Sequence, residues 1–364
     1  MSGGPPNGNE TLGSLASLDE WPEVSYRLRL TDGLPTFPPT RARVDAMLAA
    51  SGRDADEVIG AIPPADRVAT LGTVAACAVM AGALPEHLPI ITAAIEAMLD
   101  ERFNLRGVQC TTHGCAPLIV VSGPCVEALG IARAESVFGA SGSRASHAIG
   151  RAVRLVLWNS GGALPGEPVK EVFGHAGRLG IAIGEVARVS PWPTLAAARG
   201  IPTDHDAVTV FACEAPQSAA FWGANDDPPE RLDRVADVMR ALGNNNTHTM
   251  GECLVAFSPS EARHLAASGL TRGDVQHELF TRARRRLGEL RPRGPLRPSD
   301  DPAFFYEWWP EWVDQRNDDT LVPVVAEPSA IHLVVAGGDS IPWAAVCPGW
   351  GHLGGFAVTR EVDP

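Results

Sequence analysis

The chain has 364 residues, of which 45% are hydrophobic and 20% charged, a globular composition that excludes an intrinsically disordered protein. Its formal net charge of -13 argues against a nucleic-acid partner, because phosphate binding needs a clustered basic face. The one basic run, Arg282 to Arg286, is interpreted as a solvated helix end that leads into a linker.

The first residues show no basic region followed by an apolar run, so we expect no signal peptide. No apolar run reaches the roughly 18 residues needed to span a bilayer, so we expect no membrane contact. The seven cysteines are odd in number and lie mostly in apolar surroundings. They are therefore predicted to be reduced thiols of a cytoplasmic protein.

The N-terminal part is predicted to be helical after a flexible leader over residues 1–20. Helical spacing begins near Thr40, and Gly52 stands where a helix C-cap is expected. A long alanine-rich stretch follows from Val68 to Leu99, with interruptions at Gly82 and Pro85. Helices as apolar as these are buried in a core or in a subunit interface, and we expect a homo-oligomer.

Short continuous apolar runs follow, each ending at a turn-forming or polar residue. Because the runs do not alternate with polar residues, they indicate strands that are buried on both faces and connected by helices. The four predicted strands cover residues 118–121, 208–211, 254–257 and 333–335.

Two of these units resemble each other, which predicts an internal duplication. Thr112-His113 stands shortly before the first strand, and Thr247-His248 stands shortly before the third. Each strand is followed by a turn with Ser and Pro and then by a helical pattern. The predicted fold is α/β, with duplicated β-α units and a helical N-terminal part. The predicted divisions are residues 21–160, 161–290 and 291–364, in one compact domain or several.

The two histidine loops are the first candidate site. His113 and His248 are predicted to act as general acid/base groups, with Glu252 as an orienting group. The alternative is a divalent transition metal held by His113, His248 and Glu252, with Cys110 and Cys115 as further soft donors. No C-x-x-C or H-E-x-x-H motif supports that alternative.

Cys347 is a further candidate, as a nucleophile or redox thiol, and needs an electropositive and partly open site. The adjacent Gly349–Gly354 segment satisfies G-x-G-x-x-G, but it lies too near the C-terminus for a Rossmann dinucleotide site. Lys170 is the only lysine, and no Walker A sequence occurs. Pyridoxal phosphate and a P-loop nucleotide are therefore not expected.

Substrate binding is assigned to two further segments. A Gly/Ser loop before Arg144 leads into a helix that contains Arg151, and such a helix start can bind an anion. Ser122, in the turn after the first strand, is also predicted to bind the substrate. The aromatic run from Phe304 to Trp312 is interpreted as a lid over an apolar substrate, with Trp309 in contact, or as an anchor on a neighbouring subunit.

Several stretches resemble an uncharacterised bacterial family whose members are often found beside a small UGSC-type (seleno)protein. They include TDGLP, AVMAGALPEHLPIITAAIEAMLD, VQCTTHGCAPLIVVSGP, IGRAVRLVLWNSGGALPGE, SPWPTLAAARG and NNNTHTMGE. The resemblance implies roles for His113, His248 and Glu252, and a small thiol or selenol protein as a partner. The chain departs from the family at Cys110 and Cys115, and before SPW it keeps only Glu185 among several acidic residues. These departures imply that the substrate differs from that of the family.

The sequence thus predicts a small-molecule enzyme of lyase or hydrolase type that forms or cleaves a carbon–heteroatom bond, and the resemblance adds carbon–sulfur chemistry. A non-catalytic partner subunit of a thiol or selenol redox enzyme, or a metal-binding module, is the alternative.

Overall fold

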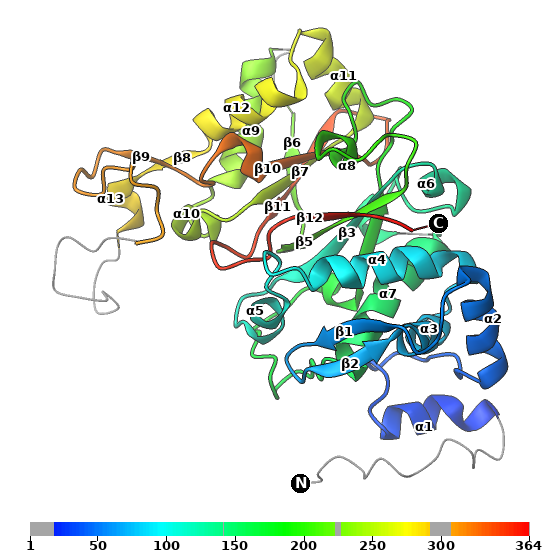
Figure 1. Ribbon diagram of the computed structural model, residues 1–364. Helices are drawn as coiled ribbons and strands as arrows, with labels where there is room; N and C mark the ends of the chain where they lie inside the picture. Colours follow the sequence, from blue (N-terminus) through cyan, green and yellow to red (C-terminus); the bar gives the residue numbers. More distant parts are fainter. Residues whose placement is uncertain (1–17, 141, 223–226, 292–306, 364) are drawn as a thin grey trace.

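The computed structural model describes residues 18–140, 142–222, 227–291 and 307–363. The N-terminal part is helical, as predicted, and a small antiparallel hairpin lies within it (Figure 1). Its elements are α1 (Trp21–Arg27), α2 (Arg41–Ser51), β1 (Val58–Ile62), β2 (Arg67–Thr70), α3 (Leu71–Met80), α4 (Leu88–Met98) and α5 (Leu105–Cys110).

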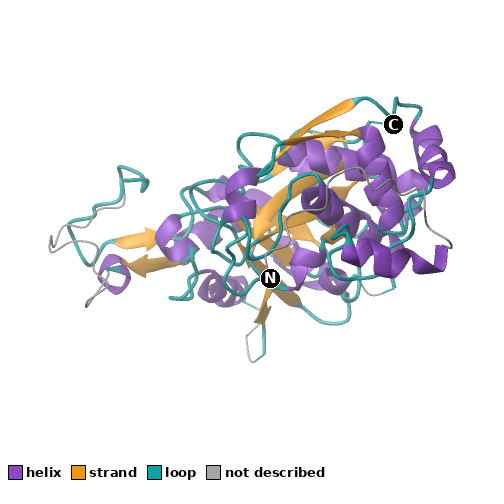
Figure 2. Ribbon diagram, turned by 90° about the horizontal axis from the view of Figure 1, so that it is seen from below, coloured by secondary structure: helices purple, strands orange, loops and turns teal. Residues whose placement is uncertain are grey.

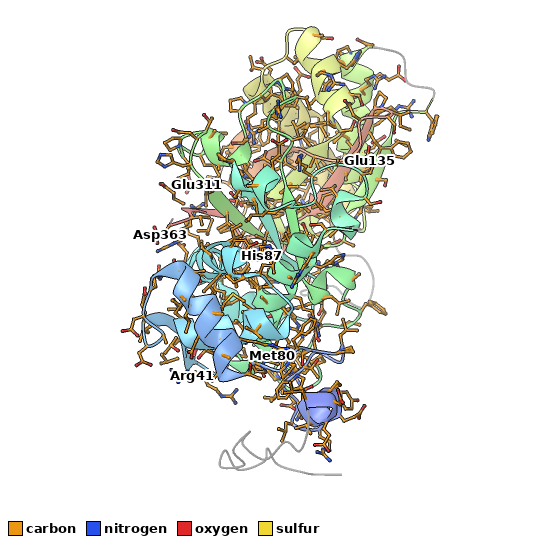
Figure 3. The ribbon with its side chains drawn as sticks, turned by 90° about the vertical axis from the view of Figure 1, so that its right-hand side faces the viewer. Arg41, Met80, His87, Glu135, Glu311 and Asp363 are labelled. Atoms are coloured by element: carbon orange, nitrogen blue, oxygen red, sulfur yellow. The ribbon has the colours of Figure 1, made fainter. Side chains whose placement is uncertain are left out.

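Helices α3 and α4 come from the alanine-rich stretch, and most of their side chains are buried in one hydrophobic core. Thr70 caps α3 by accepting the Thr73 N–H at 3.3 Å. Met80 and His87, labelled in Figure 3, mark the turn between the two helices. The predicted burial is therefore confirmed: within this chain α3 packs on α7 (Arg144–Asn159) and α2, and α4 packs on the first sheet. The homo-oligomer stays a prediction.

The first four-stranded sheet has the order β12-β5-β3-β4. Strand β3 is parallel to β4 and antiparallel to β5, and β5 is antiparallel to β12. The strands are β3 (Ala116–Ser122), β4 (Ile181–Gly184), β5 (Ala207–Cys213) and β12 (Val358–Glu361), and the helices between them are α6 (Cys125–Ala128), α7 (Arg144–Asn159) and α8 (Leu195–Ala198).

The second sheet has the order β10-β7-β11-β6 and repeats the same pairing. Strand β7 is parallel to β10 and antiparallel to β11, and β11 is antiparallel to β6. The strands are β6 (Gln217–Ala220), β7 (Cys253–Phe257), β10 (Ile331–Val335) and β11 (Trp343–Pro348), and the helices are α9 (Pro228–Met239), α10 (Asn246–Thr249), α11 (Pro259–Ala267) and α12 (Arg272–Arg282).

The two sheets pack face to face with helices on their outer sides, which gives four layers (Figure 1). In β3, Ile119 and Val121 belong to the core shared with the N-terminal helices, whereas Leu118 and Val120 face the core between the sheets. Helices α9, α11 and α12 cover the other side of the second sheet. Strands β3, β5, β7 and β10 are buried on both faces, which confirms the prediction drawn from the continuous apolar runs, whereas β6 and β12 are partly exposed.

A side unit extends from the second sheet (Figure 2). It consists of β8 (Arg284–Arg286), α13 (Leu287–Leu290) and β9 (Leu321–Pro323). The basic run begins at the end of α12 with Arg282, as predicted, but Arg284 to Arg286 form a short strand that pairs with β9 instead of a linker.

The fold class is α/β, as predicted, but the predicted divisions need correction. Strands β4 and β5 lie beyond residue 160 and yet pair with β3, so a boundary at 160/161 would cut through the first sheet. Strand β12 closes that sheet from the end of the chain. The two sheets share a pairing pattern, whereas a duplication of the sequence stays a prediction. Within the described ranges, we find no helix both long and apolar enough to cross a bilayer.

Candidate functional site

A histidine–glutamate pair lies where β3 begins and β5 ends. His113 is in the loop between α5 and β3, and its Nε2 is 2.7 Å from Glu214 Oε1. The side chains of His113 and Glu214 are 22% and 24% exposed, so solvent reaches both. His113 Nδ1 is buried and has no hydrogen-bond partner among the described residues. With Glu214 as the acceptor of a hydrogen bond from Nε2–H, Nδ1 is the nitrogen that is left to accept a proton from a ligand.

The loop that carries His113 is held on both sides by short polar contacts. The His113 N–H donates to Thr111 Oγ1 at 3.1 Å, and the Trp350 indole N–H donates to the same oxygen at 3.0 Å. Asn245 Nδ2 donates to the Trp350 carbonyl at 2.8 Å. The segment that contains Trp350 therefore connects the loops of the two predicted histidines.

A second histidine–glutamate pair lies in the second sheet and is buried. His332 Nε2 is 2.7 Å from Glu252 Oε2, and the two side chains are 4% and 13% exposed. The Ala357 N–H donates to the same oxygen at 2.5 Å. Burial alone would raise the pKa of Glu252, but the hydrogen bond and charge of His332, together with Ala357 and Arg199, lower it. Glu252 is thus kept ionised by a partner other than the predicted His248.

The backbones of the two glutamates are joined through the end of β11. The Glu214 N–H donates to the Pro348 carbonyl at 2.8 Å, and the Gly349 N–H donates to the Glu252 carbonyl at 3.0 Å. An isolated bridge between Cys213 and Gly349 continues this contact from one sheet to the other. Both pairs therefore lie at the same edge of the two sheets.

Buried polar atoms that no described residue satisfies gather beside His113. They are Gln109 Nε2, His113 Nδ1, Arg154 Nη1 and Glu171 Oε1. Arg178 connects the group, because its guanidinium donates to Glu171 Oε2 at 2.7 Å and to Gln109 Oε1 at 3.0 Å. Unsatisfied buried polar groups are costly, so several of them in one place indicate a site that a ligand completes.

Arg154 is the second guanidinium of this cluster. Burial, reinforced by the charge of Arg178, lowers its pKa to about 10, so it still carries its charge at neutral pH. Arg154 is buried and Arg178 is partly buried, and the carboxylates that act on Arg154 are Asp32 and Glu171. Because Asp32 is also paired with Arg151, the guanidiniums here favour an additional anion. The charge of the cluster therefore favours an anionic group, and the space that Arg154 and Arg178 line is only about 10 Å³, the size of one water molecule.

His175 stands beside this cluster and is held neutral. Its Nδ1 accepts the Gly177 N–H at 3.1 Å, so its Nε2 carries the proton and donates to the Cys213 carbonyl at 3.1 Å. Burial lowers its pKa, which agrees with that tautomer. Its role is to fix the loop before β4.

His248 lies apart from this arrangement of pairs. It is in the helical turn α10 rather than in a loop, and burial lowers its pKa. Its backbone carbonyl accepts the indole N–H of Trp309 at 2.9 Å and of Trp308 at 3.3 Å. Trp309 is buried in a small core with Met250, and Trp308 stacks on His352 at 4.2 Å between ring centroids. Trp309 is therefore a packing residue and not part of a lid; residues 304–306 of the aromatic run lie outside the described ranges.

Cys347 does not have the surroundings of a nucleophile. Its side chain is buried between the sheets, and a hydrogen bond with Cys213 together with burial raises its pKa well above the ordinary value. A thiol of this kind stays protonated at neutral pH. Cys115 is also buried, and burial raises its pKa to about 12.

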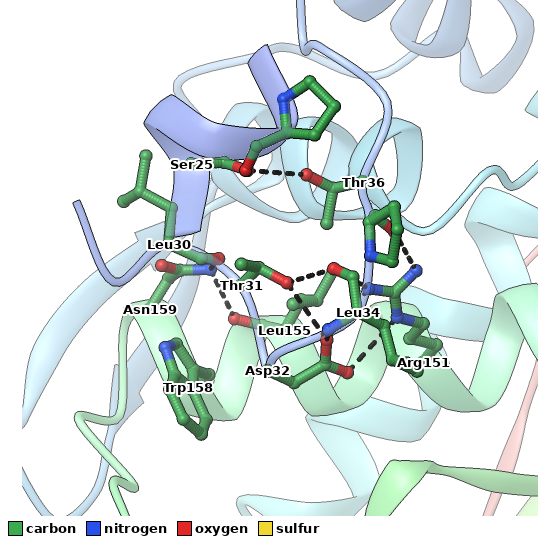
Figure 4. A network of polar contacts seen from close by, with 12 residues as sticks. Ser25, Leu30, Thr31, Asp32, Leu34, Thr36, Arg151, Leu155, Trp158 and Asn159 are labelled. Atoms are coloured by element: carbon green, nitrogen blue, oxygen red, sulfur yellow. Dashed lines mark hydrogen bonds and ion pairs between the residues drawn. The ribbon is translucent and has the colours of Figure 1, made fainter. Parts of the chain in front are cut away.

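At the predicted anion site, the guanidiniums of Arg144 and Arg151 both bind the protein itself. Arg144 Nε and Nη2 donate to the Gly82 carbonyl at 3.0 and 2.9 Å. Arg151 donates to Asp32 at 2.8 Å and to the Leu34 carbonyl at 2.9 Å (Figure 4). The two arginines fasten the N-terminal segment to α7.

Ser122 lies at the opposite end of β3. Its hydroxyl donates to Glu185 Oε2 at 2.6 Å, and the Leu195 N–H donates to both oxygens of that carboxyl at 2.9 and 3.0 Å. Burial raises the pKa of Glu185 to about 7.

The predicted metal ligands do not form a group. His113 and Glu252 each have a separate partner, and among the described residues no three His, Cys, Asp or Glu side chains are grouped so as to hold a metal ion. Sequence reasoning missed Glu214 and His332. Glu214 directly follows a predicted strand, and pairing of that strand with β3 would have placed it beside His113.

No protein-family model matches the chain, and no curated protein or solved structure is significantly similar to it.

Proposed function

We propose that the chain is a small-molecule enzyme in which His113 and Glu214 form the acid–base pair. The reaction class is the lyase- or hydrolase-type cleavage or formation of a carbon–heteroatom bond. The observation that carries this proposal is the 2.7 Å pair on a partly exposed histidine whose buried Nδ1 has no hydrogen-bond partner among the described residues. The buried pair of His332 and Glu252 has the same chemistry but little access, and is proposed to be structural.

Each residue of the cluster has a defined task in this proposal. Glu214 holds the Nε2 proton of His113 and stabilises the imidazolium once Nδ1 has taken a proton from the substrate. The same imidazolium then returns the proton to the departing heteroatom. Arg178 and Arg154 bind an anionic group of the substrate.

The test uses small-molecule extracts, because one extract presents many candidate substrates to the protein at once. Wild-type protein and the H113Q and E214Q variants are incubated with a fractionated extract, and consumed and formed species are followed by mass spectrometry. H277Q, on α12 of the second half, is the matched histidine control. We expect turnover by wild type and H277Q, reduced about 10²–10⁴-fold in H113Q. Equal turnover by all variants, or by none including wild type, would contradict the proposal.

The second candidate is a partner subunit for a small thiol or selenol protein. It is supported by the exposure of Trp308 and Trp312, which are 41% and 53% exposed. Under this proposal W312A abolishes binding of such a protein in pull-down with the recombinant partner, whereas H113Q leaves it intact. Binding that is unaffected by W312A argues against it.

A further inference from the structure

A cavity of about 330 Å³ opens at the end of β3 opposite to His113. Residues of the turn after β3 and of the segment after β4 line it, including Gly123, Pro124 and Val186. Strand β3 has seven residues, which at a rise of about 3.3 Å each separates its two ends by roughly 20 Å. The cavity is therefore distinct from the site proposed above, and nothing in that proposal uses it.

Its position and size suit a small ligand. The carboxyl ends of parallel strands are where open α/β sheets bind ligands, and β3 and β4 are a parallel pair. The volume is at the lower end of the roughly 300–1,000 Å³ of small-molecule sites. Val126, Trp192 and Pro193 supply apolar surface to the wall.

A buried carboxyl group forms the inner polar contact of the cavity. Glu185 is 4% exposed, and its oxygens accept the Ser122 hydroxyl and the Leu195 N–H. A carboxylate has about four acceptor sites, of which Ser122, Leu195 and a backbone contact of Val335 use three, so one is left for a ligand donor. Arg272 is close enough to act on Glu185 electrostatically, but its guanidinium donates to the Pro193 and Leu333 carbonyls. Arg272 thus directs these two N–H groups to backbone carbonyls and not to Glu185, so a ligand ammonium group is a complementary partner for this carboxylate.

Two guanidiniums stand at the rim of the same cavity. Arg133 and Arg188 both approach Glu127, at 3.1 and 3.6 Å. The Arg188 side chain is 81% exposed, and an ion pair of that exposure holds its partners weakly. Either guanidinium can thus exchange Glu127 for the carboxylate of a ligand.

We propose that this cavity binds a small zwitterion of the amino-acid type, with its ammonium group on Glu185 and its carboxylate on Arg133 and Arg188. The buried carboxylate of Glu185 binds the ammonium group of the ligand, and the two guanidiniums at the rim bind its carboxylate. A ligand with only one of the two charges satisfies half of the site and leaves the other half as it is in the free protein.

The test is binding of the standard L-α-amino acids to the full chain, screened by saturation-transfer NMR and quantified by calorimetry. Butylamine and butyrate are the single-charge probes. We expect at least one amino acid to bind, with E185Q weakening it about tenfold or more, because a hydrogen bond to a charged group is lost. R188Q, which changes an exposed side chain, should weaken it severalfold.

The matched control is E135Q, because Glu135, labelled in Figure 3, is near Arg133 in the chain but does not line the cavity. It should bind like wild type. Failure of every amino acid to bind, equal binding by wild type, E185Q and R188Q, or equal affinity for the single-charge probes would overturn the proposal. These outcomes are independent of turnover at His113, which the same variants leave intact.

Discussion

The two sheets of this protein have the same strand pairing, but the polar groups at their corresponding edges differ in exposure and in their hydrogen-bond partners. Each has a parallel pair, β3–β4 or β7–β10, followed by two antiparallel neighbours. Each fourth strand comes from the other half: β6 follows β5 in the chain but pairs with β11, and β12 follows β11 but pairs with β5. This exchange locks the sheets together, so neither half completes its sheet alone.

At one edge, each half has a histidine–glutamate pair with a 2.7 Å contact. In the first half the pair is about one-fifth to one-quarter exposed, and a buried imidazole nitrogen without a hydrogen-bond partner among the described residues lies beside unsatisfied buried donors. In the second half it is buried, and its carboxylate also takes the Ala357 N–H. The comparison teaches that the geometry of a histidine–glutamate pair does not by itself define a ligand site. Exposure of the pair to solvent and neighbouring polar atoms without hydrogen-bond partners do.

At the other edge the contrast is between Ser122 and Ser258, each of which ends the central parallel strand of its sheet. Ser122 binds the Glu185 carboxyl on the wall of a cavity. Ser258 Oγ accepts the Trp343 N–H at 3.0 Å and the Glu261 N–H at 3.4 Å, and so caps α11. The first half is again the one with polar groups left for a ligand.

The largest effect on stability is expected from the buried pair. E252A leaves His332 and the Ala357 N–H without their partner, and breaking a buried pair costs about 3–5 kcal/mol. E214A removes an accessible carboxylate and should cost less than about 1 kcal/mol. Urea unfolding of both variants measures the difference. Equal losses would mean that the two pairs have the same structural role.

The next effect is a pH dependence set by Glu185. Its pKa is about 7 in the folded protein against an ordinary value of 4.5, so the folded state holds the proton more tightly than the unfolded state. Stability is therefore lost as pH rises from about 4.5 to 7, by about 3 kcal/mol, and is constant above that.

E185Q removes this contribution. Wild type should lose about 3 kcal/mol relative to E185Q between pH 4.5 and pH 8. Unfolding by urea at several pH values checks it, with E135Q as the exposed-acid control. Parallel profiles for wild type and E185Q would show that the pKa of this carboxyl is not shifted.

The smallest loss of stability is expected when Ser122 or Ser258 is replaced, and its pH dependence should differ between the two. S122A removes a hydroxyl donor from a buried carboxyl, which should cost about 1.5–3 kcal/mol above pH 7 and less in acid. S258A removes a helix cap and should cost about 1 kcal/mol at any pH. Thermal unfolding at two pH values measures both. A pH-independent cost for S122A would argue against its contact with an ionised Glu185.

The sequence predicted the fold class and the strands β3, β5, β7 and β10, because continuous apolar runs are typical of strands buried on both faces, but it missed the central strand β11 of the second sheet. It did not predict β4, β6 or β12, which have four residues each and gain their stability from pairing with distant strands. His113 was found from its polar loop. Glu214 and His332 were missed, because their importance depends on which strands are neighbours.

Arginine partners were the least predictable feature. The helix that starts at Arg144 suggested anion binding, but the Gly82 and Leu34 carbonyls that take the guanidiniums belong to segments far away in the chain. Backbone acceptors carry no sequence signal, so only the packing of the N-terminal part on α7 reveals them. The same holds for Cys347, whose surroundings are set by the meeting of two sheets.

The central claim is that the accessible pair acts on a ligand and the buried pair supports the fold. The most direct measurement is turnover of extract components by H113Q and H332Q, compared at a temperature where circular dichroism shows both to be folded. The account predicts loss of turnover in H113Q and retained turnover in H332Q. Retained turnover in H113Q, with loss in H332Q, would contradict it.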